Sequence, residues 1–219
     1  MKKILCCDVE TTGLDSNKNS IVQLALLMDI DNEVVDSLLL NMQPFDEDIV
    51  SSDLNGGPEY VFNDLKLNVD TMGDMRLPAS GIKVSQLLTF MDPRDAYNKL
   101  TTFLDKYINK YEKADKVNKK AWFLGYNAQF DLNFMKRFFL KNNDIYLGSY
   151  IKWRILDPIY LLYNQDYLVE VDKRLPSMKL KDVCVHYEIE HIPHDPMSDI
   201  TATRKLWYKL MRLNDAGGQ

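Results

Sequence analysis

The chain has 219 residues, of which 46% are hydrophobic and 27% charged, with a formal net charge of −5, a composition that suits one large globular domain and excludes a disordered polypeptide. No apolar run approaches the length needed to cross a bilayer, and the apolar stretch after Met1 is too short for the core of a secretory signal peptide. Three cysteines exclude a disulfide framework, and we therefore expect a cytoplasmic protein without membrane contacts.

The first predicted strand, residues 4–10, is a short apolar run that ends in two acids. Such a bounded run is typical of a strand buried on both faces. Side chains alternate along a strand, so Asp8 and Glu10 point to the same side. Carboxylates that share a face at the end of a buried strand repel each other and need a cation or hydrogen-bond donors. Mg²⁺ or Mn²⁺ bound by oxygen ligands would meet that need; solvated acids, with Asp8 capping a turn, are the alternative at this point.

Two further strands are predicted at residues 21–30 and 34–42, separated by Asp31-Asn32, which favours a hairpin turn. With the first strand they form an antiparallel meander. Residues 43–80 lack sustained periodicity and carry eight acidic residues against two basic ones, whereas the rest of the chain is close to neutral. We interpret this acidic segment as a long loop or an insertion, with a lid, a partner-binding element and a poorly ordered segment as the alternatives.

A helix is predicted after Asp92, the residue placed to cap it, with Pro93 in the first helical position. Apolar residues at helical spacing then predict a stripe that faces the core as far as Ile108. The basic residues 113–120 are interpreted as a solvated connector, with phosphate binding as the less favoured alternative.

A second buried strand, residues 121–126, leads into an apolar helix at residues 132–140. Asn127 is placed to cap this helix, and Asp131 falls in its first turn near the end of the strand. A further short strand ends at Asp157, which the following proline marks as a helix cap, and we do not count it as a metal ligand.

A short helix is predicted at residues 180–187, and a last helix begins at Pro196, is capped by Asp195 and ends near Leu210. Asp199 lies in the first turn of that last helix.

One histidine stands out because of this acid. His194 lies just before the cap and can reach the space above Asp199, whereas His186 and His191 lack such a partner and are interpreted as surface or packing residues.

Taken together, three motifs in this order resemble the DEDDh branch of the 3′–5′ exonucleases. They are Asp8-x-Glu10-Thr11-Thr12-Gly13, Asn127-x-x-Phe130-Asp131 and His194-x-x-x-x-Asp199. The resemblance runs from residue 3 to about residue 210 and leaves residues 43–80 unmatched. It implies the α/β ribonuclease H-like fold, in which a mixed central sheet, an antiparallel meander plus parallel strands, is flanked by helices. We expect one domain over residues 1–212 and a short tail at 213–219.

The resemblance also implies roles for these residues. Asp8 would bridge two divalent ions, Glu10 and Asp199 would hold the ion beside the nucleophile, and Asp131 would act directly or through water. His194 would be the general base that takes a proton from the attacking water. The residues matched to substrate binding are Thr11, Thr12, Leu14 and Asn127.

The function that follows is a metal-dependent 3′–5′ exonuclease that releases nucleoside monophosphates from single-stranded DNA 3′ ends. It would be free-standing, or a proofreading subunit similar to the epsilon subunit of bacterial replicative polymerases, with a DNA polymerase as its partner. The alternatives are an RNA-trimming enzyme like ribonuclease T or oligoribonuclease, and a non-catalytic module that binds nucleic acid or a polymerase.

Overall fold

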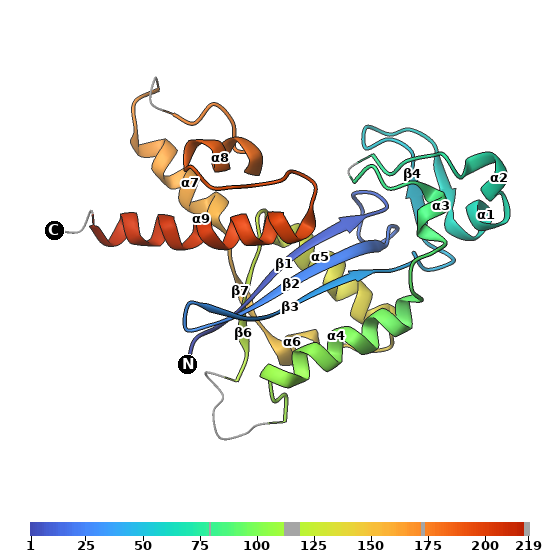
Figure 1. Ribbon diagram of the computed structural model, residues 1–219, viewed down its shortest axis with the longest axis horizontal. Coiled ribbons are helices and arrows are strands. Elements are labelled where there is room, and N and C mark those ends of the chain that lie inside the picture. The colour runs from blue at the N-terminus through green and yellow to red at the C-terminus, as the bar shows by residue number, and fades with distance from the viewer. Residues whose placement is uncertain (79, 112–118, 172–173, 217–219) are drawn as a thin grey trace.

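A five-stranded mixed sheet forms the centre of the protein, with its strands in the order β3-β2-β1-β6-β7 (Figure 1). The computed structural model describes residues 1–78, 80–111, 119–171 and 174–216. The strands are β1 (Lys3–Thr11), β2 (Ile21–Ile30), β3 (Glu33–Asn41), β6 (Ala121–Leu124) and β7 (Ile151–Leu156). The first three are antiparallel, whereas β6 pairs in parallel with β1 and β7 with β6. The predicted mixed sheet is therefore confirmed.

The hairpin between β2 and β3 turns where the sequence predicts it. Asp31 and Asn32 both have positive φ, 50° and 75°. Two such residues in succession match the right-handed twist of the flanking strands, and asparagine and aspartate tolerate this conformation better than most residues. The local turn thus sets the register of the meander.

Helices cover both faces of the sheet. They are α4 (Pro93–Tyr107), α5 (Ala128–Lys141), α6 (Leu147–Tyr150), α7 (Pro158–Leu168), α8 (Leu180–His186) and α9 (Pro196–Ala216). On β1, the buried residues Leu5 and Cys7 face α4 and α5, whereas Ile4 and Cys6 face α9 (Figure 1). Alternation along β1 therefore turns the even-numbered positions, which include Asp8 and Glu10, toward the α9 side.

Residues 43–90 form a small lobe at one end of the sheet (Figure 1). Its elements are β4 (Ile49–Ser51), β5 (Glu59–Val61), α1 (Phe62–Leu67), α2 (Val69–Met72) and α3 (Val84–Leu87). Phe62, Leu65 and Val84 are fully buried in a core that the lobe shares with Val22. The predicted long loop is therefore wrong, because helices of four to six residues are too short to show a period in the sequence.

Three further predictions concern the start of α4, the C-terminal tail and the basic connector. Asp92 caps α4 by accepting a hydrogen bond from the Arg94 backbone N–H at 2.7 Å, as predicted. The last helix extends to Ala216, so the predicted tail is helical over residues 213–216. The basic connector predicted at 113–120 lies outside the described residues except for Lys119 and Lys120. No described helix is both long and apolar enough to cross a membrane.

Candidate metal centre

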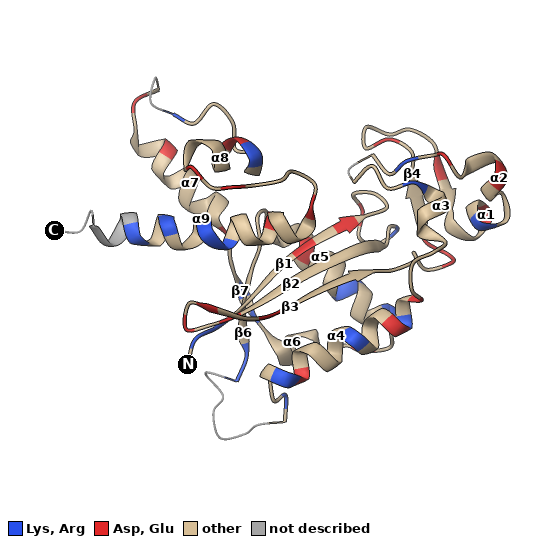
Figure 2. Ribbon diagram, viewed as in Figure 1, with Lys and Arg blue, Asp and Glu red and all other residues tan. Residues whose placement is uncertain are grey.

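Three carboxylates from distant parts of the chain meet at the end of β1. One oxygen from each of Asp8, Glu10 and Asp199 lies within 4.8 Å of the other two. Asp8 and Glu10 share the α9 face of β1, and Asp199 stands in the first turn of α9 because Asp195 caps that helix, accepting from the Ser198 N–H at 2.7 Å. Figure 2 shows acidic positions at the tip of β1 beside the start of α9.

Crowding and burial make these carboxylates costly to ionise together. Burial raises the pKa of Asp8 well above its ordinary value, and the charges of Asp131, Asp199 and Glu10 raise it further. Burial, followed by the charge of Asp199, raises the pKa of Glu10 to about 7. Burial also raises the pKa of Asp199. A divalent cation among them would favour the ionised forms, and a donor set of carboxylate oxygens alone suits Mg²⁺ or Mn²⁺.

Asp131 lies next to this cluster but its side chain is turned toward the backbone of β1. It is 3% exposed, and its Oδ1 accepts a hydrogen bond from the Val9 N–H at 3.0 Å. Burial raises the pKa of Asp131, and its charge in turn raises the pKa of Asp8. The structure therefore places Asp131 beside the cluster, where it holds the end of β1 in position.

The histidine that contacts the cluster is not the one singled out by the sequence. His191 Nε2 makes a short contact with Asp199 Oδ1, so the prediction that His191 lacks a partner is wrong. The segment before α9 folds back, and the Ile192 N–H donates to Ser198 Oγ at 2.7 Å, which brings His191 over the first turn. This reversal depends on the folded loop, and spacing along the sequence does not show it.

His194 remains exposed near Asp199. Its backbone is left-handed, with φ at 64°, and its side chain lines a cavity of about 460 Å³ together with those of His191 and Asp199. Lys179 and Lys181 line the same cavity. The sequence alone did not identify either lysine as a site residue. The signal that it offers is weak: two lysines on either side of one apolar residue, at the start of a short helix.

The threonines of the first motif hold the turn after β1. Thr12 is fully buried and its Oγ1 donates to the Ile49 carbonyl at 2.6 Å, while Thr11 Oγ1 donates to the Gly13 carbonyl at 2.7 Å. The Thr12 N–H and carbonyl are also bonded within the protein. Leu14 is 58% exposed and is free to contact a ligand.

Gly13 lies in a crowded position. A Cβ at this position would lie 2.6 Å from both Asn19 Nδ2 and Ser51 Oγ, closer than such atoms approach. A side chain at residue 13 would therefore displace Asn19 or Ser51, which are hydrogen-bonded where the turn after β1 packs against the lobe.

Asn127 stands at the cap position of α5, but its side chain makes no capping hydrogen bond, so the predicted cap is wrong. Asp157 supplies it instead, accepting from the N–H groups of Asn127 at 3.3 Å and Ala128 at 2.9 Å. Asp157 also caps its own helix through the Ile159 N–H at 3.0 Å, as predicted. Asn127 itself is exposed, with φ at 60°.

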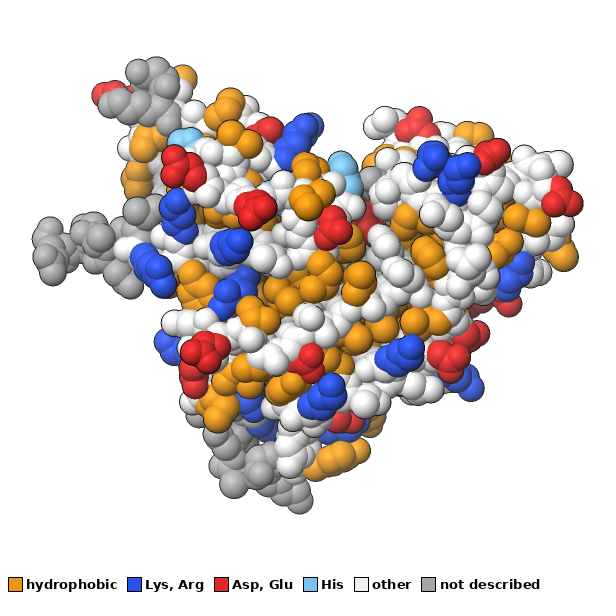
Figure 3. All heavy atoms as spheres, viewed as in Figure 1, with side chains coloured by type: hydrophobic (Ala, Val, Ile, Leu, Met, Phe, Trp, Pro, Cys, Tyr) orange, Lys and Arg blue, Asp and Glu red, His pale blue; other side chains and the backbone are white. Residues whose placement is uncertain are grey.

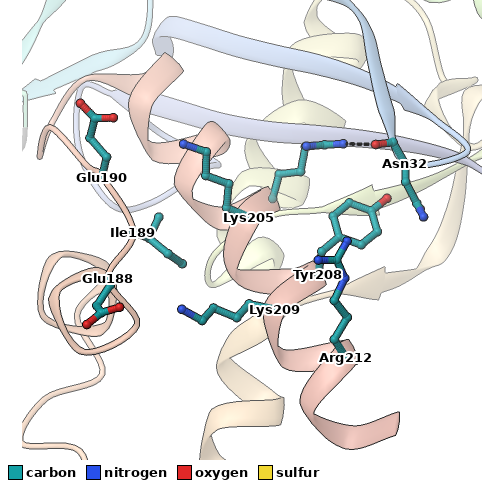
Figure 4. A pocket seen from close by; sticks show the side chains of 9 residues that line it. Asn32, Glu188, Ile189, Glu190, Lys205, Tyr208, Lys209 and Arg212 are labelled. Atoms are coloured by element: carbon teal, nitrogen blue, oxygen red, sulfur yellow. Dashed lines mark hydrogen bonds between the residues drawn. The ribbon is translucent and has the colours of Figure 1, made fainter. Parts of the chain in front are cut away.

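A larger cavity, of about 700 Å³, lies on the outer face of α9, away from Asp199 (Figure 4). Lys205, Tyr208 and Arg212 line it, and Glu188 and Glu190 stand across from them. None of the predicted site residues reaches this cavity, so its size alone does not make it the centre of the chemistry.

Comparison with known proteins yields a structural likeness only. No protein-family model matches the chain, and no curated protein matches its sequence. Escherichia coli exonuclease I in complex with a dT13 oligonucleotide matches with a TM-score of 0.68 and 17% identity, over 99% of this chain and 43% of that one. The zinc-bound form of the E. coli ExoI–ssDNA complex gives 0.68 and 17%, over 99% and 41%. An ExoI/SSB-Ct complex gives 0.66 and 17%, over 97% and 41%.

The likeness establishes the fold. The mixed sheet with helices on both faces is the ribonuclease H-like fold of these exonucleases, as the sequence predicted. The chain spans less than half the length of the exonuclease I chains that it matches.

Proposed function

We propose that this chain is a divalent-metal-dependent 3′–5′ exonuclease domain that releases nucleoside monophosphates from the 3′ ends of single-stranded DNA. The observation that carries the proposal is the meeting of Asp8, Glu10 and Asp199 within 4.8 Å at the end of β1. The shared fold and the dT13 oligonucleotide bound by the first of the matched structures support a DNA strand as the substrate.

The residues of the site have separate tasks in this proposal. Asp8, Glu10 and Asp199 hold Mg²⁺ or Mn²⁺, which when bound supplies positive charge for the attacking water and the leaving oxygen. Asp131 keeps the end of β1 in place through the Val9 N–H, and it acts on the bound ion directly or through water. His194 accepts the proton of the attacking water on a ring nitrogen, and a positioned base of this kind contributes about 10²–10⁴ in rate.

The remaining residues position the substrate and the ligands. His191 orients the Asp199 carboxylate through their contact. Leu14 packs against the terminal base, and the backbone around Thr11 and the exposed Asn127 contact the same nucleotide. Thr12 supports this turn from inside the protein.

The test is the digestion of end-labelled oligonucleotides. With Mg²⁺ or Mn²⁺ the wild-type protein should shorten single-stranded DNA from its 3′ end one nucleotide at a time, and Asp8→Asn or Asp199→Asn should abolish release. Asp95→Asn, which removes an exposed carboxylate on α4, is the matched control and should leave the rate unchanged.

The other outcomes identify the alternatives. Faster release from RNA of the same sequence would make the protein an RNA-trimming exonuclease. Preference for a mispaired over a paired 3′ end would support a proofreading role beside a DNA polymerase. Binding of DNA without release in either metal would replace the enzyme by a non-catalytic binding module.

A further inference from the structure

The cavity of about 460 Å³ beside Asp199 has two contrasting walls. One wall is formed by the start of α9 and the loop before it, and the other by the start of α8. Lys179 and Lys181 lie on the α8 wall. His194 and Asp199 lie on the α9 wall, and Tyr126 and Pro193 contribute apolar surface between the two. The cavity therefore joins the carboxylate cluster to a pair of cations.

The two lysines are available to a ligand. Both are exposed, and within the described part of the chain neither ammonium group forms an ion pair. By contrast, Lys141 is held between Glu47 and Asp48, and Lys106 is held by Asp36. Cations that the protein leaves without an acidic partner, next to a site for phosphodiester chemistry, can neutralise the phosphates of a bound strand.

The segment that carries these lysines is anchored. Tyr126 donates a hydrogen bond from its hydroxyl to the Met178 carbonyl at 2.5 Å, which ties the chain before α8 to the end of β6. Val183 and Cys184 are buried under α8 and hold the helix against the rest of the protein. The positions of the lysine backbones relative to Asp199 are thus set by the fold.

We propose that this cavity receives the phosphodiester backbone next to the bond to be cleaved, and that Lys179 and Lys181 are positioning residues that neutralise its phosphates. The inference rests on the proposed function, because it takes the ligand beside Asp199 to be a nucleic-acid strand. It adds a binding surface outside the three motifs and names the chemistry that this surface recognises.

Binding without cleavage tests the inference. A fluorescein-labelled dT oligomer is titrated with the protein in EDTA, at several salt concentrations, for the wild type, Lys179→Ala, Lys181→Ala and the double variant. Each substitution should weaken binding about two- to fivefold at low salt, the scale of one exposed ion pair. Each should also lower the slope of log affinity against log salt concentration by about 0.7, the value for one phosphate contact on a single strand.

Lys205→Ala is the matched control, because it also removes one exposed lysine but lies in the separate cavity on the outer face of α9 (Figure 4). It should change neither the affinity nor the slope. Lys181→Arg should restore both, since it keeps the charge, and unchanged thermal unfolding of all variants shows that folding is intact.

A neutral methylphosphonate linkage, placed in turn at each of the first three positions from the 3′ end, locates the contact. At one of these positions the modified strand should bind the wild type more weakly but should bind Lys181→Ala no more weakly than the unmodified strand does. A loss of affinity at every position that is equal in both proteins overturns the contact.

The inference and the proposed function can fail separately. If the lysine variants bind like the wild type, or if the wild type binds no DNA in EDTA, the inference is wrong even when nucleotides are released. If the lysine variants lose affinity but no nucleotide is released with either metal, the inference holds for a binding module and the nuclease is wrong.

Discussion

Asp8, Glu10 and Asp199 reach one place through two local rules. The two-residue repeat of β1 turns Asp8 and Glu10 to the α9 side, and the cap at Asp195 sets Asp199 in the first turn of α9. At the same scale, His191 and His194 differ in environment. The His191 side chain is 6% exposed and contacts Asp199, whereas His194 is exposed at the cavity.

Different outcomes are therefore expected when each histidine is removed. His194→Ala should slow nucleotide release about 10²–10⁴-fold and leave Mn²⁺ affinity unchanged, because it removes the base and no contact to the carboxylates. His191→Ala should weaken Mn²⁺ binding about 10–100-fold, the usual effect of removing a partner that orients a metal ligand.

Isothermal titration calorimetry with Mn²⁺ measures the effect on metal affinity. Single-turnover digestion at saturating metal measures the effect on the rate of nucleotide release. His186→Ala, on the exposed side of α8, serves as the control. A loss of less than about threefold in rate for His194→Ala contradicts its role as a base, given the contribution expected of one.

At the scale of elements, one carboxylate joins the starts of two helices. Asp157 follows β7 and is 4% exposed; it accepts from Asn127 and Ala128 at the start of α5 and from Ile159 at the start of α7. Because Asp131 lies in the first turn of α5, this cap also fixes the position of Asp131 beside β1, where it accepts the hydrogen bond from Val9.

Asp157→Ala should destabilise the protein more than the loss of an ordinary cap. Each lost cap costs about 0.5–2 kcal/mol, so the loss of two caps predicts a decrease of about 1–4 kcal/mol in the free energy of unfolding. Asp92→Ala, which removes only the cap of α4, should cost about 1 kcal/mol. Urea unfolding measures both, and equal losses in the two variants would show that only one helix depends on Asp157.

At the scale of the whole molecule, two parts flank the end of β1, and Figure 3 shows a hollow between them. One is formed by α7, α8 and α9, the other by the lobe at residues 43–90. Asp48, 3% exposed, attaches the lobe by accepting from Ser20 Oγ and Lys141 Nζ, both at 2.7 Å. At least one acidic residue of the segment 43–80, Asp48, is therefore buried and makes hydrogen bonds inside the protein.

The stability of the whole protein should fall as pH rises when metal is absent. Glu10 ionises near 4.5 in the unfolded chain but at about 7 in the folded protein, so the folded state holds the proton longer. The contribution of Glu10 to the free energy of unfolding is therefore greatest below pH 4.5. That contribution is lost as pH rises through 7, and a pKa change of this size corresponds to about 3 kcal/mol. The raised pKa values of Asp8, Asp131 and Asp199 act in the same direction.

Urea unfolding in EDTA between pH 5 and 8 measures this loss. Glu10→Gln should flatten the pH profile, and saturating Mg²⁺ or Mn²⁺ should remove most of the fall, since a ligand that binds only the folded state stabilises it. A profile that rises with pH in EDTA, or that metal leaves unchanged, would contradict the crowding of carboxylates at the site.

Local sequence was enough to predict the meander of β1, β2 and β3 and the caps of α4, α7 and α9, because alternation, turn residues and helix starts act over a few residues. It also pointed to the acids at the end of β1 and at the start of α9, since each lies at a recognisable strand end or first turn. Only the tertiary structure brought His191 onto Asp199, gave α5 its cap from Asp157 and folded residues 43–90 around a shared core. These features rest on contacts between residues far apart in the chain or across a folded loop, and no local period or spacing encodes such contacts.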